Sequence, residues 1–86
     1  MSAFQITDAT RTKIEMMAAG RPDSSRRRLA ENAIRDVAKR RADVARDLKS
    51  RRLNEHEAAR LEFDTAALET AAKAALTDLD GAKPAA

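Results

Sequence analysis

The chain has no cysteine, tryptophan or tyrosine, and it has only two glycines and two prolines among its 86 residues. Without cysteine it can form neither a disulfide framework nor a thiolate nucleophile, which is typical of a cytoplasmic protein. Aromatic residues make up 2% of the chain, so we do not expect nucleic-acid bases to stack on aromatic side chains. The scarcity of glycine and proline leaves long segments in which nothing prevents helix formation.

Large apolar side chains are also scarce. Hydrophobic residues make up 43% of the chain, but 20 of its residues are alanine, which buries little area. A single domain of this size has a small core even when large apolar residues are plentiful. We therefore expect one helical domain over residues 1–80 that gains stability by self-association or from a partner protein. No segment approaches the roughly 20 apolar residues of a membrane span, and the N-terminus lacks the apolar run of a signal peptide, so we expect no contact with a membrane.

The positions of glycine and proline divide the chain into three expected helices and a tail. A short helix is predicted over about 7–19, a long one over about 24–52 and a second long one over about 54–79. Residues 81–86 are predicted to be a disordered tail. The fold class is therefore all-α.

Side chains that can cap a helix stand near each expected start. They are Thr7 or Asp8, Asp23 or Ser24, and Asn54. The spacing from Asn54 to Glu57 resembles a capping box, in which each of the two side chains bonds to the other residue's backbone N–H.

Both long helices carry an apolar stripe with heptad-like spacing. The first stripe is Ala30, Ile34, Val37, Arg41, Val44 and Leu48, and the second is Ala58, Leu61, Thr65, Leu68, Ala72, Ala75 and Leu79. If the chain reverses near Leu53, the stripes meet in one phase, with Val37 opposite Leu68. The pattern predicts an antiparallel coiled-coil hairpin over 24–79, with arms roughly 40 Å long at 1.5 Å per residue.

The charges agree with a hairpin. Residues 26–52 hold eleven basic and four acidic groups, whereas residues 53–86 hold three basic and seven acidic groups. Arg41 occupies a stripe position, and we expect its stem to pack while its head reaches Glu62 or Glu69. The alternative is that Arg41 sets the register or the oligomeric state.

Some apolar residues fall outside the two stripes and are candidates for an oligomer or partner interface. They are Ile14, Met17, Leu29, Phe63 and Leu76. Either the helix over 7–19 covers this flank within one chain, or neighbouring subunits do.

Two basic clusters are candidate contacts for nucleic-acid phosphates. They consist of Arg26, Arg27 and Arg28, and of Lys39 and Arg40. The alternative is a solvated or partner-facing surface, partly neutralised by pairs such as Asp36 with Arg40. A helix-turn-helix is disfavoured, because the expected recognition helix runs on for too long.

Nothing in the chain predicts catalysis. His56 is the only histidine, and with no cysteine or second histidine it cannot complete a common zinc site. No glycine-rich phosphate loop or nucleophile motif is present. We expect no enzyme activity, no cofactor and no metal.

The predicted hairpin over 24–79 resembles the small terminase subunits of tailed phages, which serve DNA packaging. The resemblance implies hairpins that pack side by side into rings and engage a large motor subunit. Residues 1–23 are too short for the separate N-terminal DNA-binding domain of that family, so sequence-specific recognition of DNA is not expected.

Two functions therefore stay open. The first is an oligomerising adaptor with a basic face that contacts nucleic acid non-specifically, as in phage-type DNA packaging. The second is a small regulator, of the anti-activator or inhibitor type, that binds one partner protein through its helices.

Overall fold

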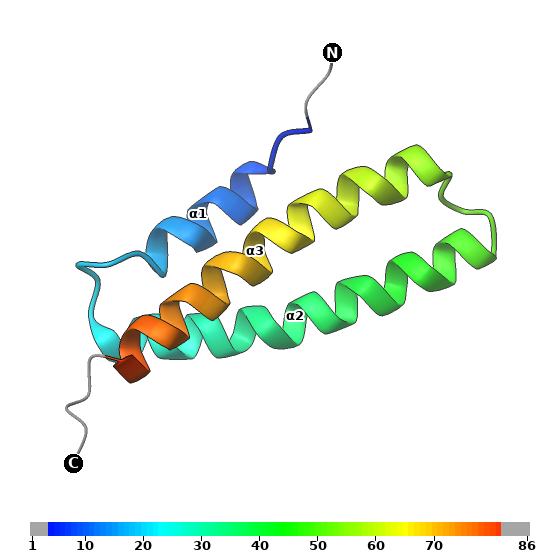
Figure 1. Cartoon of the computed structure of the whole chain (residues 1–86). Coiled ribbons are helices and arrows are strands. Elements are labelled where there is room, and N and C mark those ends of the chain that lie inside the picture. The colour runs from blue at the N-terminus through cyan, green and yellow to red at the C-terminus, as the bar shows by residue number, and fades with distance from the viewer. Residues whose placement is uncertain (1–3, 82–86) are drawn as a thin grey trace.

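The computed structural model describes residues 4–81 and contains three helices in that range, α1 (Asp8–Met16), α2 (Asp23–Lys49) and α3 (Glu55–Gly81). Helices α2 and α3 run antiparallel as a long hairpin, and α1 lies beside them at the end away from the turn (Figure 1). The all-α hairpin preceded by a short helix is confirmed. Of the tail predicted over 81–86, residues 82–86 lie outside the described residues.

Helix α1 begins as the sequence predicts and ends earlier. The Thr7 hydroxyl oxygen accepts a 3.2 Å hydrogen bond from the Thr10 N–H and so caps the first turn. The helix was expected to reach Ala19, but it stops at Met16, and the Ala18 N–H bonds to the Glu15 carbonyl in a tighter turn. Gly20 then adopts a positive φ of 94°, which glycine tolerates without strain.

Helix α2 differs from the prediction at both ends. Its preceding residue is Pro22, with no side-chain cap, so the expected capping by Asp23 or Ser24 is wrong. Asp23 instead lies inside the first turn, where its negative charge interacts favourably with the helix dipole. The helix ends at Lys49 and not near 52, because Arg51 adopts a left-handed φ of 65° that breaks the α-helical path.

The turn reverses the chain where the sequence predicts. The N–H groups of Arg52 and Leu53 both bond to the Asp47 carbonyl, at 2.8 and 3.2 Å. The capping box is confirmed, because the Glu57 N–H bonds to Asn54 Oδ1 at 2.8 Å and the Asn54 N–H bonds to Glu57 Oε1 at 3.1 Å. Helix α3 then continues to Gly81, two residues beyond the expected end.

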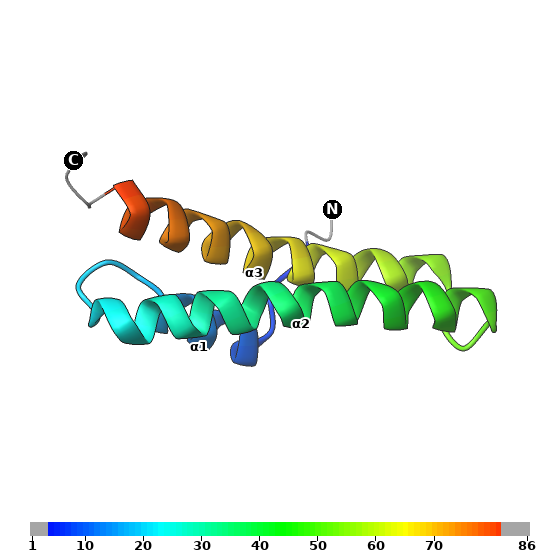
Figure 2. The same ribbon diagram turned by 90° about the horizontal axis from the view of Figure 1, so that it is seen from below.

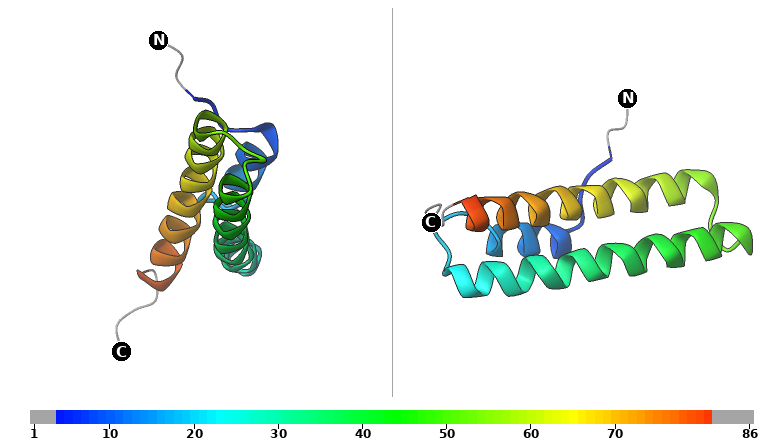
Figure 3. Two further views of the ribbon diagram at one scale, coloured as in Figure 1. Left: turned by 90° about the vertical axis from the view of Figure 1, so that its right-hand side faces the viewer. Right: turned by 60° about the horizontal axis from the view of Figure 1, so that its bottom comes forward.

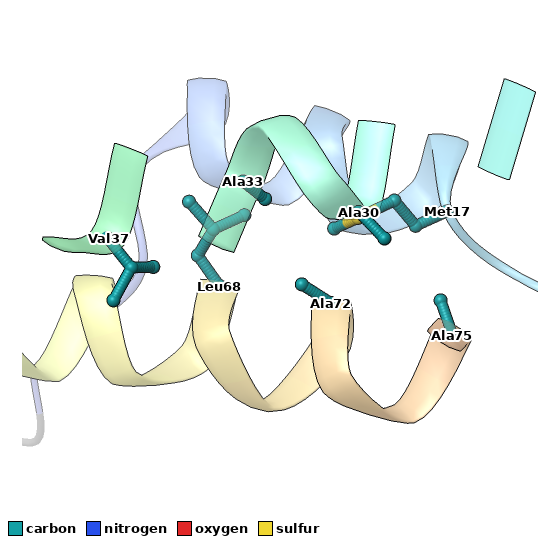
Figure 4. Packing of buried hydrophobic residues seen from close by; sticks show 7 residues of the cluster. All are labelled: Met17, Ala30, Ala33, Val37, Leu68, Ala72 and Ala75. Atoms are coloured by element: carbon teal, nitrogen blue, oxygen red, sulfur yellow. The ribbon is translucent and has the colours of Figure 1, made fainter. Parts of the chain in front are cut away.

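The core lies where α1 meets the two arms. Its buried apolar residues are Met17, Ala30, Ala33, Val37, Leu68, Ala72 and Ala75 (Figure 4). Val37 and Leu68 belong to the same cluster, which confirms the predicted register. Ala33 is buried, whereas the stripe residue Ile34 is only half-buried and packs at the edge of the cluster.

The hairpin is less well packed toward its turn. Leu48 and Leu61 are the large stripe residues nearest the turn, and each is 37% exposed. Helix α1 accompanies the arms only along the other half (Figure 3), and the two arms cross obliquely (Figure 2). The third helix therefore completes the core at one end of the hairpin only.

Candidate functional site

Arg26, the first of the predicted phosphate contacts, is buried, with 6% of the residue exposed. Its Nε donates a 2.9 Å hydrogen bond to the Met17 carbonyl, and its Nη1 lies 3.0 Å from Asp78 Oδ2. The guanidinium thus lies at the C-terminal end of α1, where its positive charge interacts favourably with the helix dipole. Through these contacts it connects all three helices. Its charge and donors are used inside the molecule.

Arg40 is also turned inward. Its Nε lies 2.8 Å from Asp36 Oδ2 and its Nη1 lies 3.2 Å from Asp64 Oδ2. Lys13 of α1 approaches the same Asp36 oxygen at 3.7 Å. Arg27 pairs with Asp80 at 3.0 Å at the end of α3 and keeps about a third of its side chain exposed.

The remaining two predicted contacts, Arg28 and Lys39, are exposed and form no ion pair within residues 4–81. Arg35 and Arg46 lie on the same side of α2, because residues seven apart are two helical turns apart. Arg35 bonds to Asn32, and Arg46 pairs with Asp43 at 3.2 Å, while both stay exposed. We call Arg28, Arg35, Lys39 and Arg46 the basic ridge.

Half of the basic ridge, Arg35 and Arg46, was not predicted. The predicted contacts lie in runs of adjacent basic residues, but adjacent residues on a helix point to different sides. The spacing of seven, four and seven along the basic ridge was the available signal. The basic ridge lies on the side of α2 opposite the buried Ala30 and Val37.

Arg41 bridges two carboxylates of α3. Its Nη2 lies 2.7 Å from Glu62 Oε2 and its Nη1 lies 2.9 Å from Glu69 Oε2. The predicted contact is confirmed, and it reaches both glutamates. Hydrogen bonds from Arg41 lower the pKa of Glu62 and of Glu69, and the same bonds raise the pKa of Arg41.

Asp64 anchors α1 to α3, and sequence reasoning did not find it. Its carboxylate accepts hydrogen bonds from the Thr7 N–H at 2.7 Å and from the Thr10 hydroxyl at 2.6 Å. Burial alone would raise the pKa of Asp64, but the hydrogen bonds from Thr10 and Thr7 and the charge of Arg40 together lower it. The buried carboxylate thus supplements the Thr7 cap at the start of α1.

The five predicted interface residues separate into covered and uncovered ones. Met17 is 2% exposed and belongs to the core, so α1 covers part of the apolar flank within its own chain. Leu29 and Leu76 are half-buried against the same core. Phe63 is 44% exposed, and together with Ile14 it lines an open groove of about 460 Å³ between α1 and α3.

The groove has no charged residue in its lining. Its floor consists of small residues of α3, namely Ala66, Ala67, Thr70, Ala71 and Ala74. At one end the Phe4 ring lies 5.9 Å from the Phe63 ring and 5.5 Å from the His56 ring, measured between centroids. His56 is exposed in the first turn of α3.

Among residues 4–81, no group of histidine and carboxylate side chains is arranged to hold a metal ion. No helix in this range combines the length and apolarity needed to cross a bilayer. No family model, curated protein or solved structure matches the chain.

Proposed function

We propose that the chain is a non-enzymatic helical-hairpin adaptor that self-associates and contacts nucleic-acid phosphates through the basic ridge. The observation that supports this proposal is the division of the arginines of α2. Arg26, Arg40 and Arg41 pair with carboxylates of α3, and the basic ridge is left exposed on the opposite side. Four carboxylates of α3 are therefore engaged on the inner side of α2, those of Glu62, Asp64, Glu69 and Asp78.

The shape of the basic ridge suits a phosphate backbone. From Arg28 to Arg46 it extends for roughly 27 Å along a straight helix, at 1.5 Å per residue. Asn32 and Ala42 lie between its members on the same side, and the carboxylates that reach the line are Asp43 and Asp47, which lie 3.2 and 3.6 Å from the Arg46 guanidinium at one end. Contacts of this kind carry no sequence information, which makes the proposed binding non-specific.

Salt dependence tests the nucleic-acid contact. If all four side chains of the basic ridge neutralise phosphates, affinity for a short DNA duplex should fall about 100-fold between 50 and 200 mM salt, because each contact releases counterions. The double variant Arg28→Gln, Lys39→Gln should bind more weakly and reduce the slope of log K against log salt by about two. Fluorescence anisotropy of a labelled duplex measures both quantities.

The matched control is the double variant Arg11→Gln, Arg21→Gln, which removes the same charge from exposed positions outside α2. It should keep most of the wild-type salt slope. An affinity that ignores salt, or an equal loss in the two double variants, would contradict a contact through the basic ridge.

The resemblance to small terminase subunits extends the proposal to DNA packaging with a large motor subunit as partner. Both parts stay predictions. The hairpin over 24–79 supports them by shape and charge alone.

The uncharged groove between α1 and α3 favours a second candidate, a small regulator that binds one partner protein. An amphipathic helix of such a partner fits an apolar groove of this kind. This candidate predicts a one-to-one complex and no retention of duplex DNA at any salt concentration.

A further inference from the structure

The side of α3 that faces away from α2 carries no charge over five helical turns. We call this surface the α3 outer stripe, and its members are Ala59, Phe63, Ala66, Thr70, Ala74 and Thr77. Ala66 is half-buried and the other five are exposed. In a chain with 36% charged residues, an uncharged line at spacings of three and four is the pattern of a second helix–helix seam.

The surroundings of the α3 outer stripe favour a helix as its occupant. Ile14 of α1 forms one wall of the groove, and small residues of α3 form its floor. Interaxial distances between helices depend on the side chains at the contact, and small ones allow a close approach. Phe63 is the single large member of the stripe, and it lies near one end.

We propose that the occupant is the α3 outer stripe of a second copy of this chain, packed antiparallel. The proposal rests on the self-association part of the proposed function and names the surface that performs it. In this arrangement Ala66 faces Thr70 of the second copy, and Ala59 faces Thr77 of the second copy.

Charges on the two flanks of the stripe are complementary in this arrangement. Arg60 and Asp78 lie on one flank, and Glu62 and Lys73 lie on the other. Antiparallel packing brings each flank against its own counterpart in reverse order. Arg60 therefore meets Asp78 of the second copy, and Glu62 meets Lys73 of the second copy, each twice by symmetry. Within one chain Asp78 also pairs with Arg26, Glu62 with Arg41 and Lys73 with Glu69, so these contacts between copies would be shared with pairs already formed.

Side-chain size decides the orientation, since opposite charges meet across a parallel pair as well. Antiparallel packing places Phe63 of each copy against Ala74 of the other, so one large residue meets one small residue at both ends. Parallel packing would place two Phe63 rings together and two Ala74 methyl groups together. The helices would then be held apart at one end and leave a gap at the other, which loses packing contacts.

The opposite side of the hairpin cannot serve the same purpose. Two copies that met through the basic ridge would bring like charges together, which disfavours association. Pairing through the α3 outer stripe leaves both basic ridges on the outside of the pair. Self-association and phosphate contact are therefore compatible in one assembly.

The mass in solution tests the proposal. Size-exclusion chromatography with light scattering over a concentration series should give twice the 9.4 kDa of one chain. Ala74→Glu places a charge opposite Phe63 of the second copy and should restore the mass of one chain. The matched control Ala38→Glu makes the same change at an exposed position of α2 and should leave the mass of the pair unchanged.

Disulfide cross-linking tests the orientation. Because the chain has no cysteine, only the introduced cysteines can form disulfides. Chains carrying Ala59→Cys and chains carrying Thr77→Cys are mixed in equal amounts and oxidised. We expect disulfides between the two kinds of chain, because antiparallel packing brings these positions together. Positions 59 and 77 are roughly 27 Å apart along the helix, so parallel packing would link each kind only to itself.

The proposal is overturned by a wild-type mass of one chain at all concentrations, by an Ala74→Glu variant that stays paired, or by cross-links within one kind of chain only. Duplex binding by Ala74→Glu separates this failure from that of the proposed nucleic-acid contact. If the Ala74→Glu variant is a single chain that still binds DNA with a steep salt dependence, the proposed contact through the basic ridge stands. If the variant stays paired, the chain self-associates through a surface other than the α3 outer stripe.

Discussion

The carboxylate of Asp64 accepts a 2.6 Å hydrogen bond from the hydroxyl of Thr10, a residue 54 positions earlier in the chain. Thr10 is completely buried, and Asp64 is 7% exposed. Since the same carboxylate also holds the Thr7 N–H at 2.7 Å, it fixes the start of α1 on α3. The position of α1 in turn decides which apolar surface is covered, and it places the Met17 carbonyl within hydrogen-bond distance of Arg26.

Replacing Asp64 tests this anchor and its pH dependence. Asp64→Asn should lower the free energy of unfolding by about 2 kcal/mol, the usual scale for buried hydrogen bonds to a charged group. The folded state lowers the pKa of Asp64, so its stabilisation is complete above the ordinary aspartate pKa and is lost as pH falls through the lower folded value. Urea denaturation between pH 7 and pH 3 should show the wild type approaching the variant in acid.

Asp80→Asn is the control for that experiment, because Asp80 is exposed and its ion pair within residues 4–81 is with the partly exposed Arg27. Its effect at pH 7 should stay within about 0.5 kcal/mol. Equal losses in the two variants would show that Asp64 has no special role.

Thr10→Val removes the hydroxyl that donates to Asp64 and keeps the size and branching of the side chain. We expect a loss of about 1–2 kcal/mol, because a buried carboxylate loses its shortest hydrogen bond. Thr12→Val is the matched control, since Thr12 is exposed on the same helix. Hydrogen exchange of the α1 amides should accelerate in the Thr10 variant alone, and similar exchange in both would argue against the anchor.

The bridge from Arg41 to Glu62 and Glu69 has a titration signature. Removing the guanidinium in Arg41→Gln should raise the pKa of both glutamates toward the ordinary range, because hydrogen bonds from Arg41 are the largest cause of their lowering. In the wild type this stabilisation is present at neutral pH and is lost as pH falls through the lowered values. Carbon-detected NMR titration of the side-chain carboxyls measures the change.

Arg35→Gln serves as the control for the bridge, since its side chain bonds to Asn32. It should leave both glutamate pKa values where they are. An Arg41 variant whose titration curves overlay those of the wild type would rule out the bridge in solution.

Replacing Arg26 and replacing Arg28, the first and third residues of the arginine triplet, should have different effects on stability. Arg26→Gln removes a buried guanidinium that binds the Met17 carbonyl and Asp78, and we expect it to cost about 2 kcal/mol of stability. Arg28→Gln, two positions along, should change stability by less than about 0.5 kcal/mol, because its side chain is exposed. Thermal denaturation of the two variants distinguishes them directly, and equal destabilisation would place both arginines in the same environment.

The helices, the turn and the register of the hairpin could be predicted from the sequence because their causes are local or periodic. The box formed by Asn54 and Glu57 acts within one helical turn. The phase that sets Val37 against Leu68 follows from repeated spacing alone. The helix ends were less predictable, since Met16 and Lys49 end their helices through backbone turns that few side-chain preferences specify.

The sequence by itself determined that this chain folds into three helices with a reversal near Leu53, and that its two arms carry opposite charge. Only the tertiary structure decided what the inward-facing arginines bind. Helical spacing places Arg26 and Arg28 on different sides of α2, but the burial of Arg26 and its hydrogen bond to the Met17 carbonyl depend on where α1 docks. The docking of α1 rests on Asp64, whose hydrogen bonds to Thr7 and Thr10 span more than fifty residues, and no local pattern in a sequence records a contact of that length.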